Sequence, residues 1–187
     1  IVSVADFRGK RIGTSGLPEA RARLESVLQA AGIAPSEVTI IDIGWGQTAA
    51  LLSGAVDVVT GILRTWQGVE AELEGYNVRF LQWEDYGLPS IQTLVLVTTE
   101  QTVAQRPRMV EGFVRAMVRG YQWAMDNPRQ AAEYVLRADP QLRPELLMRS
   151  LQLLAPYFRE PEPKVGWQSA ERWEAYAAWM RERGLLP

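Results

Sequence analysis

The chain has 187 residues, of which 47% are apolar, and its formal net charge is −2. This length is enough for one or two compact lobes, and a nearly balanced charge offers no basic stripe for a nucleic acid. The sequence contains no histidine and no cysteine, which excludes disulfides, thiolate chemistry, imidazole catalysis and the metal sites of these residues. We therefore predict a non-enzymatic protein that holds no cofactor and no metal.

The N-terminal residues look like the interior of a longer chain. The sequence opens on Ile1 instead of Met, without the pattern of a signal peptide, and no apolar run approaches the roughly 20 residues of a membrane-spanning helix. We expect the natural protein to have a further N-terminal portion.

The first hundred residues alternate short β-branched runs with amphipathic segments. We predict strands at residues 11–14, 38–43, 56–60, 78–81 and 93–97, and helices at residues 18–31, 47–52 and 64–74. Strands that alternate with helices of this length indicate an α/β sheet that is largely parallel.

Beyond Thr99 only helical patterns remain. A long amphipathic helix is predicted around residues 110–125, followed by helices at 129–138, 143–155 and 170–183, with Pro161 and Pro163 in the last connection. Four helices without strands cannot easily bury all their apolar faces on each other. We expect them to cover a sheet, part of which lies outside this sequence.

Three strand-to-helix loops carry the candidate site. They hold Thr14, Ser15, Gly16 and Glu19 in the first loop, Trp45 and Gln47 in the second, and Thr60, Gly61, Trp66 and Glu70 in the third. The carboxyl ends of parallel strands form the ligand crevice of open α/β sheets, and helix N-termini offer N–H groups to polar ligand atoms. Taken alone, the first loop is more simply an ordinary turn and Glu70 a solvated helix charge, whereas Trp45 could equally be a ring packed on the neighbouring loop.

Several stretches carry a family resemblance. They are Asp6–Gly13, Ala49–Val59, and Glu70 followed by Glu84–Pro89 and Thr93–Val97. In this order and spacing they resemble the family of periplasmic binding proteins for sulfonates, nitrate and thiamine pyrimidine precursors. The last set looks most like the branch that binds pyrimidine precursors and riboflavin, and residues 114–121 and 127–132 are similar to the family's following helix pair.

The resemblance implies an α/β fold of the periplasmic-binding-protein type II class, present in part. In that family the chain leaves a first lobe, builds a second and returns, and the two lobes close on a ligand. Residues 1–98 would then form a complete α/β second lobe with the ligand-facing loops, and residues 99–187 the helical return to the first lobe. The resemblance also implies a periplasmic or extracellular, membrane-anchored lipoprotein of an ABC importer, with a membrane permease as its partner.

The resemblance further implies a ligand site on the second lobe. It assigns ligand contact to Thr14, Ser15, Gly16, Glu19, Trp45, Gln47, Thr60, Gly61, Trp66, Glu70 and Tyr86. These loops offer rings, backbone amides and two carboxylates, which suit a flat amino-heterocycle, whereas a sulfonate or nitrate would need Arg or Lys. We expect a small aromatic nutrient such as a thiamine pyrimidine precursor.

Other functions stay open at this point. Riboflavin or a sulfonate- or nitrate-type anion could be the ligand, and the effector domain of a transcription regulator shares the two-lobe fold. A related pyrimidine-synthesising enzyme depends on His and a Cys-rich site, which this sequence lacks. We expect a monomer for the full protein, whereas this piece could pair with a second copy.

Overall fold

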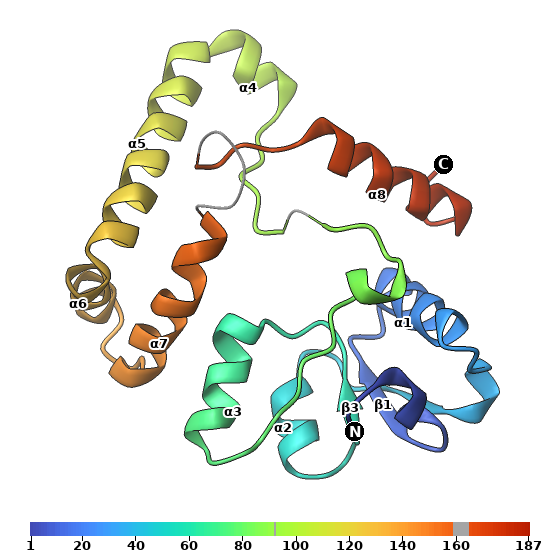
Figure 1. Cartoon of the computed structure of the whole chain (residues 1–187). Coiled ribbons are helices and arrows are strands. Elements are labelled where there is room, and N and C mark those ends of the chain that lie inside the picture. The colour runs from blue at the N-terminus through green and yellow to red at the C-terminus, as the bar shows by residue number, and fades with distance from the viewer. Residues whose placement is uncertain (92, 159–164) are drawn as a thin grey trace. The chain divides into compact units, whose positions relative to one another are not determined.

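The computed structural model describes residues 1–91, 93–158 and 165–187 (Figure 1). The chain divides into two compact units: the first comprises Ile1–Ile91 with Ser169–Pro187, and the second comprises Gln92–Gln168. The assignment of residues 1–98 and 99–187 to two lobes of a longer protein stays a prediction.

A three-stranded sheet forms the centre of the first unit. Its strands are β1 (Arg11–Thr14), β2 (Thr39–Asp42) and β3 (Val58–Val59). β1 lies in the middle and pairs in parallel with both neighbours, in the order β2-β1-β3. Parallel neighbours require crossover connections, which helices provide here. The largely parallel α/β sheet predicted from the sequence is confirmed.

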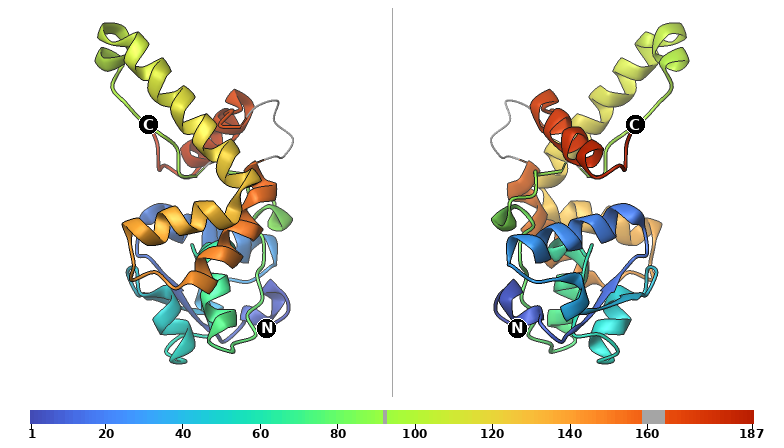
Figure 2. Two further views of the ribbon diagram at one scale, coloured as in Figure 1. Left: turned by 90° about the vertical axis from the view of Figure 1, so that its left-hand side faces the viewer. Right: turned by 90° about the vertical axis from the view of Figure 1, so that its right-hand side faces the viewer.

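Helices lie on both sides of this sheet. They are α1 (Pro18–Ala30), α2 (Gln47–Leu52) and α3 (Val69–Leu73), the last entered through a π-helical turn at Arg64–Gly68, with short 3-10 turns at Val4–Phe7, Pro35–Glu37 and Glu84–Tyr86. Figures 1 and 2 show α1 on one side of the sheet and α2 with α3 on the other. α1 begins at Pro18, where a missing N–H costs no hydrogen bond.

The central strand β1 separates two packed layers, because its side chains alternate between the two faces of the sheet. Ile12 is fully buried and packs in one cluster with Leu24 and Leu28 of α1. Gly13 faces the opposite side, where a Cβ atom would overlap the Ile43 side chain. A larger residue at position 13 would require the Ile43 side chain to move.

The predicted strands at 78–81 and 93–97 are wrong. Residues 78–81 run without strand pairing, and so do the described residues of the second segment. Leu94 takes φ 58°, outside the β region, and is 87% exposed. A β-branched run becomes a strand only where a free sheet edge accepts its backbone. Sequence pattern does not supply that edge.

The C-terminal helix α8 (Ala170–Glu182) packs on α1 within the first unit. Its Tyr176 and Trp179 are buried in the same cluster as Leu24 and Leu28. The Arg183 Nε donates to Ser26 Oγ of α1 at 2.8 Å. The sequence analysis predicted that this helix belongs with the helices before it, whereas the structure places it in the first unit. Helical periodicity does not identify the surface on which a helix packs.

The second unit is helical throughout its described residues. It contains α4 (Glu100–Gln105), α5 (Pro107–Asp126), α6 (Pro128–Ala138) and α7 (Pro144–Leu154), and a 3-10 turn at Ala155–Phe158. Three of these helices were predicted, whereas α4 was missed; its signal is Thr99, whose hydroxyl accepts the Thr102 N–H at 3.1 Å as an N-cap. Pro161 and Pro163 lie outside the described residues.

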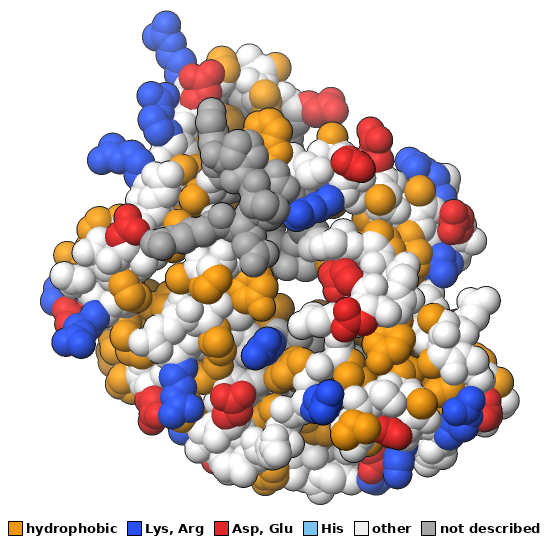
Figure 3. Space-filling view, viewed as in Figure 1, with side chains coloured by type: hydrophobic (Ala, Val, Ile, Leu, Met, Phe, Trp, Pro, Cys, Tyr) orange, Lys and Arg blue, Asp and Glu red, His pale blue; other side chains and the backbone are white. Residues whose placement is uncertain are grey.

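The long helix α5 is amphipathic but buries none of its residues. Phe113, Tyr121 and Trp123 are all exposed, although Tyr121 stacks on Phe158 with ring centroids 5.0 Å apart. In the space-filling view, apolar side chains also reach the surface over the neighbouring helices of this unit (Figure 3). Among the described helices, none is both long and apolar enough to cross a membrane.

Candidate functional site

The three predicted ligand loops leave the sheet at one edge, because β1, β2 and β3 run parallel. Thr14 ends β1 and Thr60 follows β3, and both are buried. The Ile43 N–H donates to the Thr14 carbonyl oxygen at 2.9 Å, and the Thr60 N–H donates to the Gly13 carbonyl oxygen at 3.0 Å. These bonds continue the ladders past the strand ends and fix where each loop departs.

The loop after β1 turns at Gly16, which has φ +77°. Only glycine adopts this conformation at little cost. The Gly16 N–H donates to Thr14 Oγ1 at 3.2 Å, and a Cβ atom at this position would overlap the Asp42 carboxylate. Ser15 is half-buried beside it. Gly16 thus permits both the turn and the close approach of Asp42.

Asp42 is a candidate site residue that the sequence analysis missed. It ends β2, is exposed, and accepts the Gly44 N–H on Oδ1 at 3.0 Å. Its carboxylate adds acceptors beside the first loop, where N–H or O–H groups of a ligand could donate to it. Its position near the carboxyl end of the strand predicted at residues 38–43 could have identified it from the sequence.

Glu19 lies in the first turn of α1 and is held by two side chains. Arg23 forms an ion pair with Glu19 Oε1, and the Tyr176 hydroxyl of α8 donates to the same oxygen. Burial and the adjacent Glu19 carboxylate raise the pKa of Tyr176. The hydroxyl therefore keeps its proton at neutral pH and remains a donor.

The loop after β2 presents Trp45 to solvent. This side chain is 80% exposed and stands between Gly44 and Gly46, so Trp45 is not a ring packed on the neighbouring loop. An exposed ring in a loop at the carboxyl edge of the sheet can stack on a flat ligand. Gln47, in contrast, is buried at the start of α2.

The loop after β3 places its residues differently. Gly61 is exposed with φ +75°, whereas Trp66, in the π-helical turn, and Glu70, in α3, are half-buried. Tyr86 lies farther along the chain, and its hydroxyl oxygen accepts the Val4 N–H at 3.4 Å. Residues 14–16, 45 and 60–61 therefore share the carboxyl edge with Asp42.

A cavity of about 400 Å³ lies within the first unit. It borders β3 and the unpaired segment 76–83, and apolar core residues such as Val4, Phe7 and Leu24 line much of it. Of the predicted site residues it includes Thr60, Gly61 and Tyr86. Its size suits a small ligand, but Gly16, Asp42 and Trp45 at the carboxyl edge do not line it.

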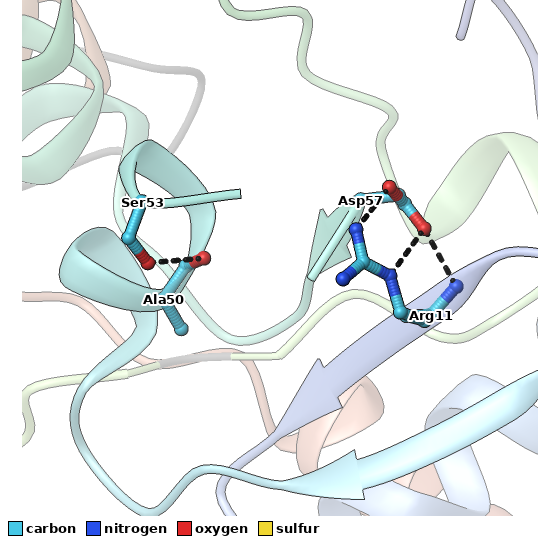
Figure 4. A network of polar contacts seen from close by, with 4 residues as sticks. All are labelled: Arg11, Ala50, Ser53 and Asp57. Carbon is cyan, nitrogen blue, oxygen red and sulfur yellow. Dashed lines mark hydrogen bonds and ion pairs between the residues drawn. The ribbon is translucent and has the colours of Figure 1, made fainter. Parts of the chain in front are cut away.

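The amino edge of the sheet carries a different polar cluster (Figure 4). Asp57, just before β3, accepts hydrogen bonds from the backbone N and the guanidinium of Arg11 at the start of β1. Ser53 Oγ donates to the Ala50 carbonyl oxygen at 3.2 Å near the end of α2. Within the described residues, no group of acidic side chains is arranged to hold a metal ion.

Comparison with known proteins identifies the family. The model of the NMT1/THI5-like family matches residues 1–131. The formylaminopyrimidine-binding protein of Halalkalibacterium halodurans is 30% identical over 182 residues, which cover 95% of this chain and 55% of that protein. The riboflavin-binding protein RibY of Chloroflexus aurantiacus is 30% identical over 199 residues, covering 100% of this chain and 54% of that protein.

An enzyme name also occurs among the relatives. A 4-amino-5-hydroxymethyl-2-methylpyrimidine phosphate synthase of Legionella pneumophila is 31% identical over 161 residues, covering 84% of this chain and 50% of that protein. The chain thus spans about half the length of the curated relatives it matches.

The fold has a solved counterpart. The alkanesulfonate-binding protein SsuA from Xanthomonas axonopodis pv. citri, bound to MOPS, superposes with a TM-score of 0.67 at 19% identity, covering 100% of this chain and 62% of that one. This likeness confirms the periplasmic-binding-protein fold, present in part. With the family model matching most of its length, the chain belongs to the NMT1/THI5-like family.

Proposed function

We propose that this chain is part of an extracytoplasmic solute-binding protein of an ABC importer, and that it binds a small, flat heteroaromatic nutrient. The observation that carries the proposal is the exposed Trp45 ring, which leaves the same sheet edge as the loop of Gly16 and the Asp42 carboxylate. A ring that stacks and carboxylates that accept N–H groups suit an amino-heterocycle.

A pyrimidine of the thiamine-precursor type is the ligand we favour. The name of the formylaminopyrimidine-binding relative supports this choice, and that of the riboflavin-binding relative supports riboflavin as the second candidate. Both ligands are flat and carry N–H donors. An inorganic or sulfonate anion fits less well because it would have to approach Asp42 and Glu19.

The test is a thermal-shift and calorimetric screen of this chain and of the complete gene product. The probes are 4-amino-5-hydroxymethyl-2-methylpyrimidine, formylaminopyrimidine, riboflavin, an alkanesulfonate and nitrate. A ligand at about 100 times its Kd stabilises the folded state by about 2.7 kcal/mol. Stabilisation by a pyrimidine or by riboflavin supports the proposal, and stabilisation by anions alone would overturn it.

The non-enzymatic role has its own test, since one relative is named a synthase. Without His or Cys in this chain, we expect the bound pyrimidine to be recovered unchanged in mass spectra. Appearance of a phosphorylated pyrimidine would contradict a pure binding role.

The transport role and location are tested in the upstream coding sequence. A signal peptide with a lipidated Cys there would support a membrane-anchored importer component. An upstream helix-turn-helix would instead favour a transcription regulator. Pull-down of an ABC permease by the full protein would establish the partner.

A further inference from the structure

A closed triangle of side chains holds the Glu19 carboxylate. Glu19 and Arg23 are one turn apart on α1, and Tyr176 comes from α8, 157 positions later than Glu19. Tyr176 donates to Glu19 Oε1, Arg23 pairs with the same oxygen, and Arg23 Nη2 donates to the Tyr176 hydroxyl oxygen at 2.8 Å. Each member therefore contacts both of the others.

Packing fixes the position of the Tyr176 hydroxyl. Tyr176 is only 8% exposed, and its ring stacks on Trp179 with centroids 5.5 Å apart. The Arg23 guanidinium lies 5.5 Å from the centroid of the same Tyr176 ring. A ring held on two sides has little freedom in its side-chain torsions, so its hydroxyl is a fixed point against which Glu19 is oriented.

The arrangement leaves the second carboxylate oxygen of Glu19 available. Both contacts use Oε1, and no hydrogen bond to Oε2 joins it to the part of the chain that the structure describes. The Glu19 side chain retains 31% of its exposure. Oε2 can therefore accept an N–H from a ligand, in an orientation that its partners determine.

We propose that Tyr176 is a positioning residue for ligand recognition: by holding Oε1 of Glu19 it directs Oε2 toward ligand N–H donors, so that α8 tunes the preference for amino-heterocycles. This inference rests on the proposed function, with Glu19 as a ligand contact. A hydrogen-bonded, pre-oriented acceptor binds more tightly than a mobile one, because less side-chain entropy is lost on binding.

The experiment measures Kd for 4-amino-5-hydroxymethyl-2-methylpyrimidine and for riboflavin by calorimetry. Tyr176→Phe removes one hydroxyl and keeps the stacked ring. We expect it to weaken binding of the aminopyrimidine by about tenfold, the usual effect of losing one hydrogen bond to a charged group. In the Glu19→Gln background the same substitution should have little further effect, because a residue that acts through Glu19 needs its carboxylate.

Ser26→Ala is the matched control. It removes a separate hydrogen bond to α1, in which Nε of Arg183, the residue after α8, donates to Ser26 Oγ at 2.8 Å, and should lower the melting temperature without changing Kd. Equal loss of affinity in Ser26→Ala and Tyr176→Phe would overturn the inference, since a loosened α8 would then explain both.

Two further outcomes separate this inference from the proposed function. If the wild-type chain binds a probe and Tyr176→Phe binds it equally well, only the positioning role is overturned. If the wild-type chain and the full gene product bind none of the probes, the proposed function itself fails and the inference falls with it.

Discussion

Asp57 accepts three hydrogen bonds from a single residue, Arg11. The Arg11 backbone N lies 2.9 Å and Nε 3.1 Å from Asp57 Oδ2, and Nη2 lies 2.8 Å from Oδ1 (Figure 4). The contacts join the residue before β3 to the first residue of β1. The Val-Asp stretch that resembles the family therefore has a structural role here, at the edge opposite the candidate site.

This pair predicts a pH dependence of stability. The Arg11 contacts lower the pKa of Asp57 from 3.8 to about 2, so the stabilisation is complete above the unfolded pKa of 3.8 and is lost as the pH falls toward 2. We expect Asp57→Asn to be less stable than wild type at pH 7, with the difference shrinking as the pH approaches 2. Thermal melts from pH 7 to pH 2 measure this difference in stability.

Asp85→Asn, on an exposed 3-10 turn of the same unit, is the control. If the two variants lose stability relative to wild type with the same pH profile, the pH dependence does not come from the Asp57–Arg11 contacts.

Gly16 should tolerate no side chain. Gly16→Ala forces an L residue to φ +77° and overlaps Asp42, and we expect it to abolish ligand binding and to lower stability by at least about 1–2 kcal/mol. Gly54→Ala is the matched control, because Gly54 has φ +73° with no atom near its Cβ position. Both substitutions carry the cost of a positive φ, so the additional loss of unfolding free energy in Gly16→Ala, measured by urea denaturation, is the cost of the overlap with Asp42. Equal effects would show that Asp42 moves aside freely.

Trp45 should contribute to binding without contributing to stability. Its ring is exposed, so Trp45→Ala is expected to change unfolding free energy by less than about 0.5 kcal/mol. We expect it to raise the Kd of an aromatic ligand by about tenfold through lost stacking. Calorimetry beside chemical denaturation separates the two effects, and Trp167→Ala, another exposed Trp, should change neither. An unchanged Kd in Trp45→Ala would remove this ring from the site.

Leu24 should be critical for the first unit. Its side chain is 0% exposed in the cluster shared by α1, β1 and α8. Leu24→Ala leaves a cavity and is expected to cost about 2–5 kcal/mol, measured by urea denaturation. Leu186→Ala, at a partly exposed position near the C-terminus, serves for comparison. A cost below about 1 kcal/mol for Leu24→Ala would mean that this cluster is not the core.

The local elements were largely predictable from sequence. The strand at Arg11–Thr14 and the helix from Pro18 were predicted nearly to the residue, because a β-branched run, a proline at the first helical position and Gly32 act over a few residues. The strands predicted at 78–81 and 93–97 are absent from the structure. A strand needs a partner strand from elsewhere in the chain, which a local pattern does not reveal. The packing of α8 in the first unit was also missed, because it depends on contacts with residues far away in the sequence.

Residue identity and local order were enough to exclude Cys and His chemistry and to predict the parallel α/β arrangement and the family. Which side chains meet became visible only in the folded chain: Asp42 lies against Gly16, Tyr176 holds Glu19, and Arg11 binds Asp57. Those contacts join residues between 26 and 157 positions apart, and the packing of separate elements, which no local pattern encodes, brings them together.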